Sequence, residues 1–422
     1  NALSKFYLTD SEWKPETEKL LKTAYEVHSD EPISHAVTQA LYGTVLENSV
    51  TRLERFAACA YAHYLNYGLR LKERQLLEFA SVDMGNIYHD ALEHFSRRVE
   101  KSEYTWFNIP EDVQETFIEE SMNDAIAGCK NAGAFENVRN RYLTGRMRQT
   151  IKRTVWALTT QIQKGKFVPS DFEVSFSRAD KLDAIRFQLS DEEKMNLLGR
   201  IDRVDTYETS DKVYVKIIDY KSGNTSFSLV NLYHGLQLQL VVYMNAALEL
   251  EEKRHPGKKA EPAGIFYYHI QNPIVDGLGN ETEAEIRNSV LEQLKLNGLV
   301  NDDPEIYEAM DSDFAGNSSV IPIGKKTDVS LKATSKVAST YDFSVMSDYV
   351  QEKIKETGKK IFAGDISIHP YSLDGKSGCD YCPYHTVCGF DTRMPGYSYH
   401  KLEKFDSADE ILKRMENEKQ EQ

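Results

Sequence analysis

Two carboxylates and a lysine lie near the middle of the 422-residue chain, at a spacing that can support metal-dependent chemistry. Asp202 belongs to the segment GRIDRVD, and Asp219 and Lys221 belong to IIDYKSG. Side chains two apart in a strand share a face, and an antiparallel neighbour can bring Asp202 beside Asp219 and Lys221. Two carboxylates at one point repel each other unless a cation lies between them, and their oxygens suit Mg²⁺ or Mn²⁺. An adjacent lysine can orient a water molecule or stabilise charge on a phosphate.

The alternative is that these residues are ordinary surface charges on hairpin strands, which is the usual meaning of a single short motif. The surroundings favour a site, because IIDYKSG follows the apolar run VYVKI and precedes a glycine turn.

Hydrophobic periodicity predicts the elements that position these groups. Apolar residues recur every three or four positions from Ser11 to about Lys166, which predicts a run of amphipathic helices. From Asp171 the short segments FEVSF, AIRFQL, LLGRIDRVDTYE and KVYVKIIDYK predict a strand meander. The helical period returns from Leu229 to Glu252, and AGIFYYHI then indicates another buried strand. The fold class is therefore α/β.

Composition shifts divide the chain further. Residues 271–280 and 301–335 look irregular, and a helix is expected near 345–361. The chain opens without Met and is interpreted as a piece of something longer. The predicted organisation is a helical lead-in over 1–48 from a preceding region, then 49–166 (helical), 167–270 (catalytic core), 271–340 (irregular or inserted), 341–390 (cysteine segment) and a tail over 391–422 that frays.

Four separated motifs resemble those of the RecB-type nucleases within the PD-(D/E)XK superfamily. In order along the chain they are GNIYHDALE, GRIDRVD, DYKSG and QLQLVVY. The resemblance implies a small mixed β-sheet flanked by helices, and Mg²⁺- or Mn²⁺-dependent hydrolysis of DNA phosphodiesters. It also implies metal ligands at His89, Asp202 and Asp219, a catalytic Lys221, and Gln239 and Tyr243 as residues that orient substrate or lysine. Glu173 falls where the family carries an acidic residue.

Some of these residues also have simpler interpretations. A lone histidine on an amphipathic helix, such as His89, is more often packed or solvated than a ligand, although imidazole binds metals well. Gln239 and Tyr243 lie one helical turn apart and share a face, which a polar edge of the core would also explain. Their place directly after the DYK strand favours the site.

The cysteines form a second pattern. Cys379, Cys382 and Cys388 make a C-x2-C-x5-C motif, and Cys59 in FAACAYAHY is the natural fourth ligand of a closed metal site. Spacing alone leaves zinc and iron-sulfur open equally, with His385 as a possible replacement ligand. Cys129 has no partner in this pattern and is expected to be a buried small residue.

The upstream cysteine helix RLERFAAC, combined with the later cysteine motif, resembles the AddB-type nuclease domain of bacterial AddAB helicase-nuclease complexes. The resemblance runs from about Val50 to Phe390. It implies a 4Fe-4S cluster on Cys59, Cys379, Cys382 and Cys388, and an AddA-type helicase-nuclease partner subunit. It further implies exonuclease action on single-stranded DNA during double-strand-break processing and recombinational repair, in the bacterial cytoplasm. Two alternatives are an inactive DNA-binding or partner-docking module of the same fold, and a CRISPR-associated adaptation nuclease, whose chain is typically much shorter.

The net charge of −15, from 51 basic and 66 acidic residues, argues against a nucleic-acid partner when only the total is counted. Locally the balance reverses, because RNRYLTGRMRQTIKR carries six basic residues and no acidic one. A solvated helix face explains such a run equally well. The candidate DNA-binding residues are Arg139, Arg141, Arg146, Arg148, Lys152 and Arg153, with a second group at Arg52, Arg55, Arg70 and Lys72. No apolar stretch reaches the roughly 20 residues of a membrane span.

Overall fold

The computed structural model describes residues 2–24, 30–72, 74, 81–129, 138–176, 185–275, 279, 281–312 and 314–420. It divides the chain into two compact units. The first unit comprises Asn1–Glu73, Phe187–Met195 and Lys353–Asp406, and the second comprises Arg74–Arg186, Asn196–Glu352 and Ser407–Gln422. The domain bounds expected from the sequence stay a prediction.

A mixed β-sheet forms the centre of the second unit. Its main strands follow the order β4-β5-β6-β7-β8, and β2 also pairs with β4. The β2–β4, β4–β5 and β6–β7 pairs are antiparallel, whereas β5–β6 and β7–β8 are parallel. The mixed α/β fold predicted from the sequence is confirmed. The strands are β2 (Val168–Phe176), β4 (Lys194–Glu208), β5 (Lys212–Lys221), β6 (Lys259–His269), β7 (Asn297–Asn301) and β8 (Val337–Ala338), and β3 spans Ile185–Gln188.

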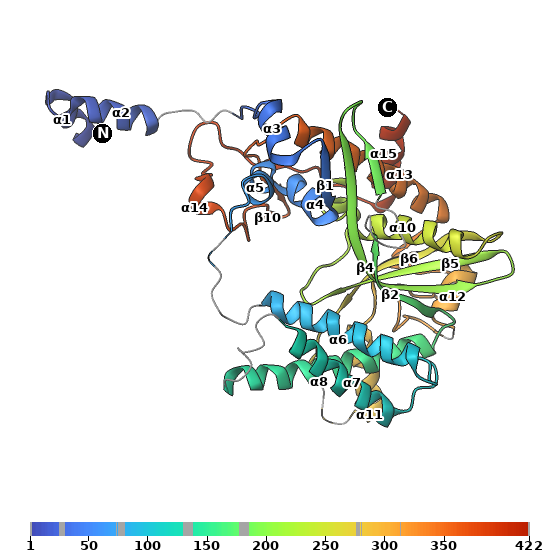
Figure 1. Ribbon diagram of the computed structural model, residues 1–422. Coiled ribbons are helices and arrows are strands. Elements are labelled where there is room, and N and C mark those ends of the chain that lie inside the picture. Colours follow the sequence, from blue (N-terminus) through green and yellow to red (C-terminus); the bar gives the residue numbers. More distant parts are fainter. Residues whose placement is uncertain are drawn as a thin grey trace. The chain divides into compact units, whose positions relative to one another are not determined.

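Helices cover this sheet. Helices α6 (Ser81–Lys101), α7 (Glu111–Gly128) and α8 (Val138–Gln163) pack against one another (Figure 1). Their apolar sides join one hydrophobic core with Ile218 of β5 and Phe266 of β6. Helix α10 (Gln239–Arg254) packs on β5 and β6, after the short helix α9 (Leu229–Tyr233). Because helices cover it, β5 is buried along nearly its whole length, as the apolar run VYVKIIDY predicts.

The prediction of an irregular segment over 271–340 was wrong for three stretches. Helix α11 (Glu283–Gln293) begins with a capping box formed by Thr282 and Glu285, and α12 (Pro304–Met310) has Asp303 as its N-cap and proline at its first position. Strand β7 pairs with β6, so this part of the segment belongs to the sheet. The caps are readable in the sequence, but high polarity and scattered Gly and Asn obscured them.

The C-terminal part is more ordered than the sequence suggested. Helix α13 (Thr340–Phe362) confirms the helix expected near 345–361. The tail over 391–422 was expected to fray, but its later part forms helix α15 (Ala408–Gln420). Two residues of this helix, Ile411 and Met415, are buried. Two apolar residues four apart on an otherwise charged helix are enough to bury one face.

The first unit is built from short helices and small strand pairs. The described residues of the segment over 1–48 form three helices and end in strand β1. In this unit β9 pairs with β10 and β11. The elements are α1 (Ala2–Thr9), α2 (Lys14–Ala24), α3 (His35–Tyr42), β1 (Val45–Ser49), α4 (Val50–Ala58), α5 (Ala60–His63), the π-helical turn η1 (Tyr64–Gly68), β9 (Tyr371–Leu373), β10 (Lys376–Ser377), α14 (His385–Cys388) and β11 (His400–Lys401).

Within the described residues, none of the helices has the length and apolar character needed to cross a bilayer.

Candidate active site

The β4–β5 hairpin places the central carboxylates next to each other. The antiparallel register pairs Arg203 with Ile218, and the backbone N–H of Tyr220 donates to Asp202 Oδ2 at 2.7 Å. This hydrogen bond fixes the carboxylate of Asp202 against the strand that carries Asp219. Both carboxylates are buried, with Asp219 only 1% exposed. Burial of two acids side by side is costly unless other groups compensate their charge.

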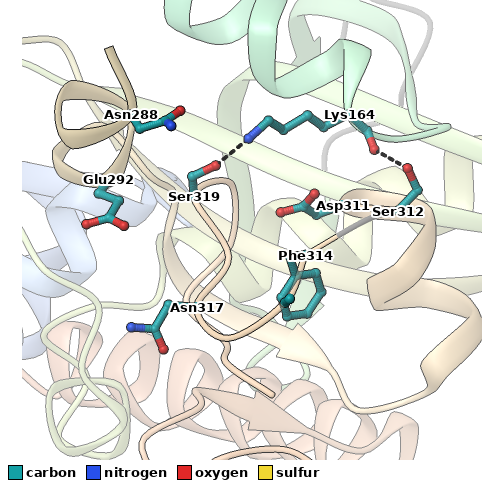
Figure 2. Close-up of a pocket in the computed structure, with 9 residues that line it drawn as sticks. Lys164, Asn288, Glu292, Asp311, Ser312, Phe314, Asn317 and Ser319 are labelled. Carbon is teal, nitrogen blue, oxygen red and sulfur yellow. Dashed lines mark hydrogen bonds between the residues drawn. The ribbon is translucent and has the colours of Figure 1, made fainter. Parts of the chain in front are cut away.

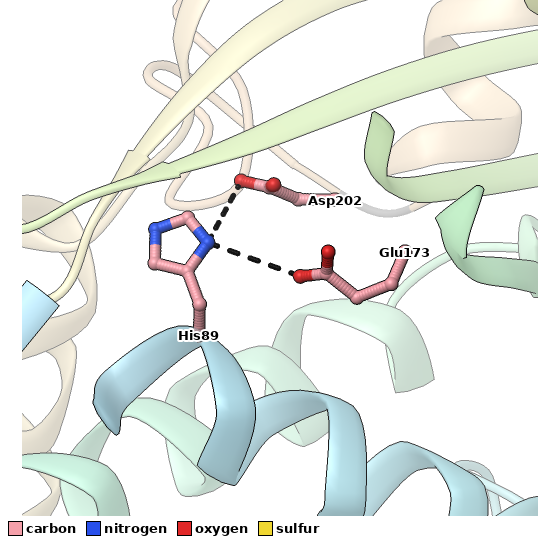
Figure 3. Close-up of side chains that lie close together, drawn as sticks. All are labelled: His89, Glu173 and Asp202. Carbon is pink, nitrogen blue, oxygen red and sulfur yellow. Dashed lines mark ion pairs between the residues drawn. The ribbon is translucent and has the colours of Figure 1, made fainter. Parts of the chain in front are cut away.

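Helix α6 and strand β2 complete a group of three metal-binding side chains. Figure 3 shows His89, Glu173 and Asp202 converging from α6, β2 and β4. The Nδ1 atom of His89 lies 3.3 Å from Asp202 Oδ2 and 3.9 Å from Glu173 Oε1. One ligand atom from each residue falls within 4.8 Å of the others, the only such trio among the residues that the structure describes. One nitrogen and several carboxylate oxygens suit a divalent cation of the Mg²⁺ or Mn²⁺ class.

A hydrogen-bonded chain of side chains adjoins this trio. Lys221 Nζ lies 2.6 Å from Asp219 Oδ2 and donates to Gln239 Oε1 at 2.9 Å. The side-chain amide of Gln239 in turn donates to Asp219 Oδ1 at 2.8 Å and to the hydroxyl of Tyr243 at 2.9 Å. Gln239 is the first residue of helix α10, which packs on β5, so its side chain can reach the end of that strand. The polar-edge interpretation of Gln239 and Tyr243 therefore does not describe their contacts.

The metal ligands expected from the sequence differ in detail from this arrangement. They were His89, Asp202 and Asp219, whereas the described trio contains Glu173 and leaves Asp219 with Lys221 and Gln239. Asp219 stays close enough to Asp202 for the two charges to interact. The structure thus gathers all these residues, with Glu173 in a more central place than its loose motif match suggested.

Glu173 is held in an unusual backbone conformation. Its φ is +52° inside strand β2, between Phe172, paired with Arg203, and Val174, paired with Ile201. A non-glycine residue in this region costs about 1–3 kcal/mol, and such strain concentrates at functional sites. Burial, and next the charge of Asp202, raise the pKa of Glu173 to about 8. Burial and Asp202 likewise raise the pKa of Asp219.

His89 responds to the same charges in the opposite sense. Burial by itself lowers the pKa of His89, but hydrogen bonding and attraction to Asp202, with smaller effects of Glu173 and Asp219, raise it above the ordinary value. Raised carboxylic-acid pKa values together with a raised imidazole pKa indicate an excess of negative charge at one point. A bound divalent cation would relieve this excess, and the donor set fits such an ion.

These shifts predict a pH-dependent stability of the metal-free protein. An unfolded glutamic acid ionises near pH 4.5, whereas folded Glu173 ionises near pH 8, so the folded state binds more protons between these values. The contribution of Glu173 to stability is therefore fully present below about pH 4.5 and is lost as pH rises towards 8. We expect the chelator-treated protein to melt at lower temperature as pH increases from 5 to 8, and Glu173→Gln to flatten this slope. Glu249→Gln on the exposed face of α10 is the control; equal slopes for the two variants would contradict the assignment.

A cleft of about 730 Å³ opens beside the trio. It is lined by residues of α6 including His89 and by Arg200, Ser222 and Cys129. Arg200 was not predicted as a site residue from the sequence. It precedes Asp202 by two positions in GRID, and the two side chains therefore share a strand face. Its Nε lies 2.5 Å from Glu173 Oε2 while more than half of the side chain stays exposed. It can therefore hold Glu173 and still meet an anionic substrate. Cys129 is only partly buried in this wall, so the expectation of a buried small residue holds only in part.

The basic run lies on α8, and its charges are partly neutralised. Arg148 pairs with Glu119 at 2.5 Å, and Lys152 pairs with Glu115 at 2.7 Å, both on α7. Arg153 stacks over Trp156 with its guanidinium carbon 5.2 Å from the ring centroid. These contacts favour the solvated-face interpretation for the middle of the run. Arg141 and Arg146 are exposed, and the side chain of Arg139 lies outside the described residues.

The four patterned cysteines lie in one unit, with Cys59 between α4 and α5. Cys59, Tyr61, Tyr64 and Cys382 pack around a small core that contains Tyr384. Burial, followed by repulsion from Cys59, Cys382 and Cys388, raises the pKa of Cys379 to about 11. A thiol whose pKa is raised in this way becomes a thiolate near neutral pH only when a cationic group lies beside it.

The sulfur spacing bears on the kind of metal. A zinc ion bound at about 2.3 Å would draw its sulfurs to about 3.8 Å from one another. Among the described residues, no three cysteine sulfurs lie within 4.8 Å of one another. The described cysteines are therefore farther apart than the ligands of a bound zinc ion would be. The ring of His385 is engaged elsewhere, because its Nε2 lies 2.6 Å from the carbonyl oxygen of Cys379.

The second unit has another cavity, about 500 Å³ in volume, whose lining does not include the metal-binding trio. Figure 2 shows Lys164 and Asp311 in its wall, with Asn288 and Glu292 from α11. Lys164 Nζ donates to Ser319 at 2.7 Å, and Asp311 accepts from the hydroxyl of Ser318 at 2.7 Å. Lys164 and Asp311 thus form hydrogen bonds with the loop between α12 and β8 and stabilise it.

Comparison with known proteins agrees with this geometry. The family model described as the PD-(D/E)XK nuclease superfamily matches residues 47–389. The chain belongs to the PD-(D/E)XK nuclease superfamily. As a member of this superfamily it has the expected mixed sheet, with the carboxylates and lysine on two adjacent strands.

Individual curated relatives give a more specific similarity than the superfamily does. The chain is 37% identical over 394 residues to a protein of Lachnoclostridium phytofermentans that is named as a subunit of an ATP-dependent helicase/deoxyribonuclease, covering 91% of this chain and 33% of the relative. Proteins with the same name match at 34% identity in Clostridium tetani, over 99% of this chain and 36% of the relative, and at 33% in Alkaliphilus metalliredigens, over 98% and 36%. The chain thus spans about a third of the length of the curated relatives it matches.

Proposed function

We propose that this chain is the nuclease domain of a DNA-processing helicase-nuclease, and that it hydrolyses DNA phosphodiesters with a divalent metal. The observation that carries the proposal is the convergence of His89, Glu173 and Asp202 beside the chain of Asp219, Lys221 and Gln239. These groups line or adjoin an open cleft in a member of a nuclease superfamily.

Each residue has a distinct role in this proposal. His89, Asp202 and Glu173 would hold Mg²⁺ or Mn²⁺, with Asp219 as a further ligand, and the ion would supply Lewis acidity at the scissile phosphate. Asp219 and Gln239 fix the ammonium group of Lys221 from two sides. Lys221 then orients the attacking water or stabilises negative charge on the phosphate. Tyr243 fixes the amide of Gln239 and acts through it.

The names of the relatives bear on the substrate and the partner. We infer that the domain acts as an exonuclease on single strands released by a helicase subunit of the AddA type, during double-strand-break repair. The names of the relatives couple a helicase to a deoxyribonuclease, which supports this choice over a CRISPR-associated nuclease. An inactive docking module remains the competing proposal, but it gives no reason for two buried carboxylates to be held against a lysine.

The direct test incubates the full 422-residue chain with end-labelled single-stranded and duplex DNA. We expect Mg²⁺-dependent shortening of the single strand, no cleavage in EDTA, and recovery when excess Mg²⁺ is restored. Intact single strands at every metal concentration, from protein whose melting temperature still rises with Mg²⁺, would favour the inactive module.

We further propose that Cys59, Cys379, Cys382 and Cys388 hold a 4Fe-4S cluster that staples α4 to the segment around α14. The grouping of the four cysteines in one unit and the raised pKa of Cys379 support a shared metal site. The resemblance of the cysteine pattern to AddB-type nuclease domains supports a 4Fe-4S cluster over zinc. Its role here is structural, because it ties together parts of the first unit that are far apart in the sequence.

Anaerobic purification tests the cluster. We expect brown protein that contains iron and sulfide in equal amounts, a Cys388→Ser variant that loses both, and a Cys129→Ser variant that keeps them, because Cys129 is not among the four proposed ligands. Colourless wild-type protein with stoichiometric zinc would reject the cluster.

A further inference from the structure

A cavity of about 430 Å³ lies in the first unit, bounded by the end of α3, by β1, by α4 and by the chain that follows η1. Its wall carries three cations, Arg52, Arg70 and Lys72, and two aromatic rings, Tyr42 and Tyr67. We call it the cationic pocket. It is distinct from the nuclease cleft, which is lined by residues of the second unit.

Arg52 is held in the pocket by two contacts. Its guanidinium carbon lies 4.5 Å from the centroid of the Tyr67 ring, and Nη1 donates to the backbone carbonyl of Glu47. Its Nε is shielded from solvent and has no acceptor among the described residues. A guanidinium stacked on a ring and anchored at one end presents its remaining donors in a fixed direction.

The charge around the pocket is unbalanced. Three cations face one acidic residue, Glu47, so the described lining has a net charge of +2 in a chain whose total is −15. Burial lowers the pKa of Arg52, and the proximity of Arg70 lowers it further. Within the described part of the chain, neither Arg70 nor Lys72 pairs with a carboxylate. Like charges held together in this way are relieved by an anionic ligand, just as clustered carboxylates are relieved by a cation.

The backbone around the pocket is built for close packing. A π-helical turn, which is rare and concentrates at functional sites, carries Asn66 and Tyr67. A Cβ atom at Gly68 would lie only 2.8 Å from the hydroxyl of Tyr42, so glycine allows this tyrosine to approach. The hydroxyl of Tyr384 lies 3.1 Å from Asn66 Oδ1 and 3.2 Å from the carbonyl oxygen of Leu71. These contacts fix the segment from which Arg70 and Lys72 project.

We propose that the cationic pocket binds a phosphodiester group of single-stranded DNA, as a contact separate from the nuclease cleft. The choice of DNA as the source of the anion rests on the proposed function. The exposed side chains of Arg70 and Lys72 are donors for phosphate oxygens, and Arg52 adds positive charge beside them. The rings of Tyr42 and Tyr67 line the same pocket, where unpaired bases can stack. An acidic chain needs such a local positive site, because its overall field repels a polyanion.

The test measures binding of fluorescent oligothymidylate to the full chain in EDTA, where no cleavage interferes, at several salt concentrations. The test variant is Arg70→Gln/Lys72→Gln, whose two side chains are exposed. The charge-matched control is Lys359→Gln/Lys401→Gln, two exposed lysines of the same unit that do not line the pocket. We expect the test variant to bind about tenfold more weakly, with a salt dependence flatter by about 1.4 in the log–log slope, and the control to match the wild type.

Equal affinities of the test variant and the control would overturn the proposal. Inorganic phosphate or labelled oligoglutamate that loses affinity in the test variant, while oligothymidylate does not, would overturn it in favour of a free anion or an acidic protein segment. Cleavage is measured separately with Mg²⁺. A wild type that binds through the pocket but never cleaves would reject the proposed nuclease function and leave the pocket in place.

Discussion

Replacing Asp219 with asparagine is expected to lower DNA cleavage by at least about 10³-fold while the protein remains folded. The substitution is nearly isosteric, so it leaves no cavity at a position that is only 1% exposed. It removes one negative charge from the metal site, and it removes the carboxylate oxygen that lies 2.6 Å from Lys221 Nζ. The substitution is therefore expected both to weaken metal binding and to release Lys221 from its fixed orientation.

Two measurements separate this effect from a general loss of structure. Calcium or manganese titration should show weaker binding to Asp219→Asn, and the melting temperature without metal should not fall, because one of the mutually repelling acids has become neutral. Asp211→Asn, an exposed acid in the turn of the same β4–β5 hairpin, is the matched control and should cleave like the wild type. Cleavage by Asp219→Asn within about threefold of this control would reject the proposed site.

The sequence predicted the parts of the fold whose pattern is local and repeated. The strands that carry Asp202 and Asp219 alternate or run apolar over many residues, and tertiary packing agrees with that pattern. The prediction of an irregular segment over 271–340 failed because α11, β7 and α12 are short, and each is stabilised by caps or by pairing with a distant strand.

The residues of the site could be predicted from the sequence better than their arrangement in space. The resemblance to RecB-type nucleases indicated His89, Asp202 and Asp219, but the central place of Glu173 depends on a positive φ that no periodicity reveals. The pairing of Arg148 and Lys152 with acids of α7 was likewise invisible, because it depends on how two helices pack. Local sequence determines which groups are available, and packing decides which of them meet.

A buried charge network supports the strand that carries Asp202. Arg203 donates to both carboxylate oxygens of Asp205, at 2.6 and 2.8 Å, and Lys216 Nζ lies 2.8 Å from Asp205 Oδ2. The side chains of Arg203 and Asp205 are at most 1% exposed, and that of Lys216 is 7% exposed. The guanidinium carbon of Arg203 lies 5.4 Å from the Trp106 ring, and Lys216 Nζ lies 5.0 Å from the Phe167 ring. Burial alone would raise the pKa of Asp205, but Arg203 and Lys216 lower it below its usual range.

Asp205→Ala is therefore expected to lower the free energy of unfolding by about 3–5 kcal/mol, because it leaves two buried cations without a carboxylate. Lys216→Met leaves the neutral Arg203–Asp205 pair in place and replaces one long side chain by another, so it should cost less than about 1.5 kcal/mol. Glu249→Ala, which breaks an exposed pair with Lys253, should cost less than about 1 kcal/mol. Urea unfolding followed by tryptophan fluorescence measures all three, since Trp106 lies against Arg203.

The order of the three variants shows whether charge balance or packing stabilises the network. If Lys216→Met were as damaging as Asp205→Ala, the packing of the long side chain would matter more than charge balance. If Asp205→Ala resembled Glu249→Ala, the network would contribute nothing, and the β4–β5 hairpin would depend on its apolar residues alone. The expected order places charge balance first. It also predicts lower DNA cleavage by Asp205→Ala near its unfolding midpoint, because Asp202 lies on the same strand three residues before Asp205.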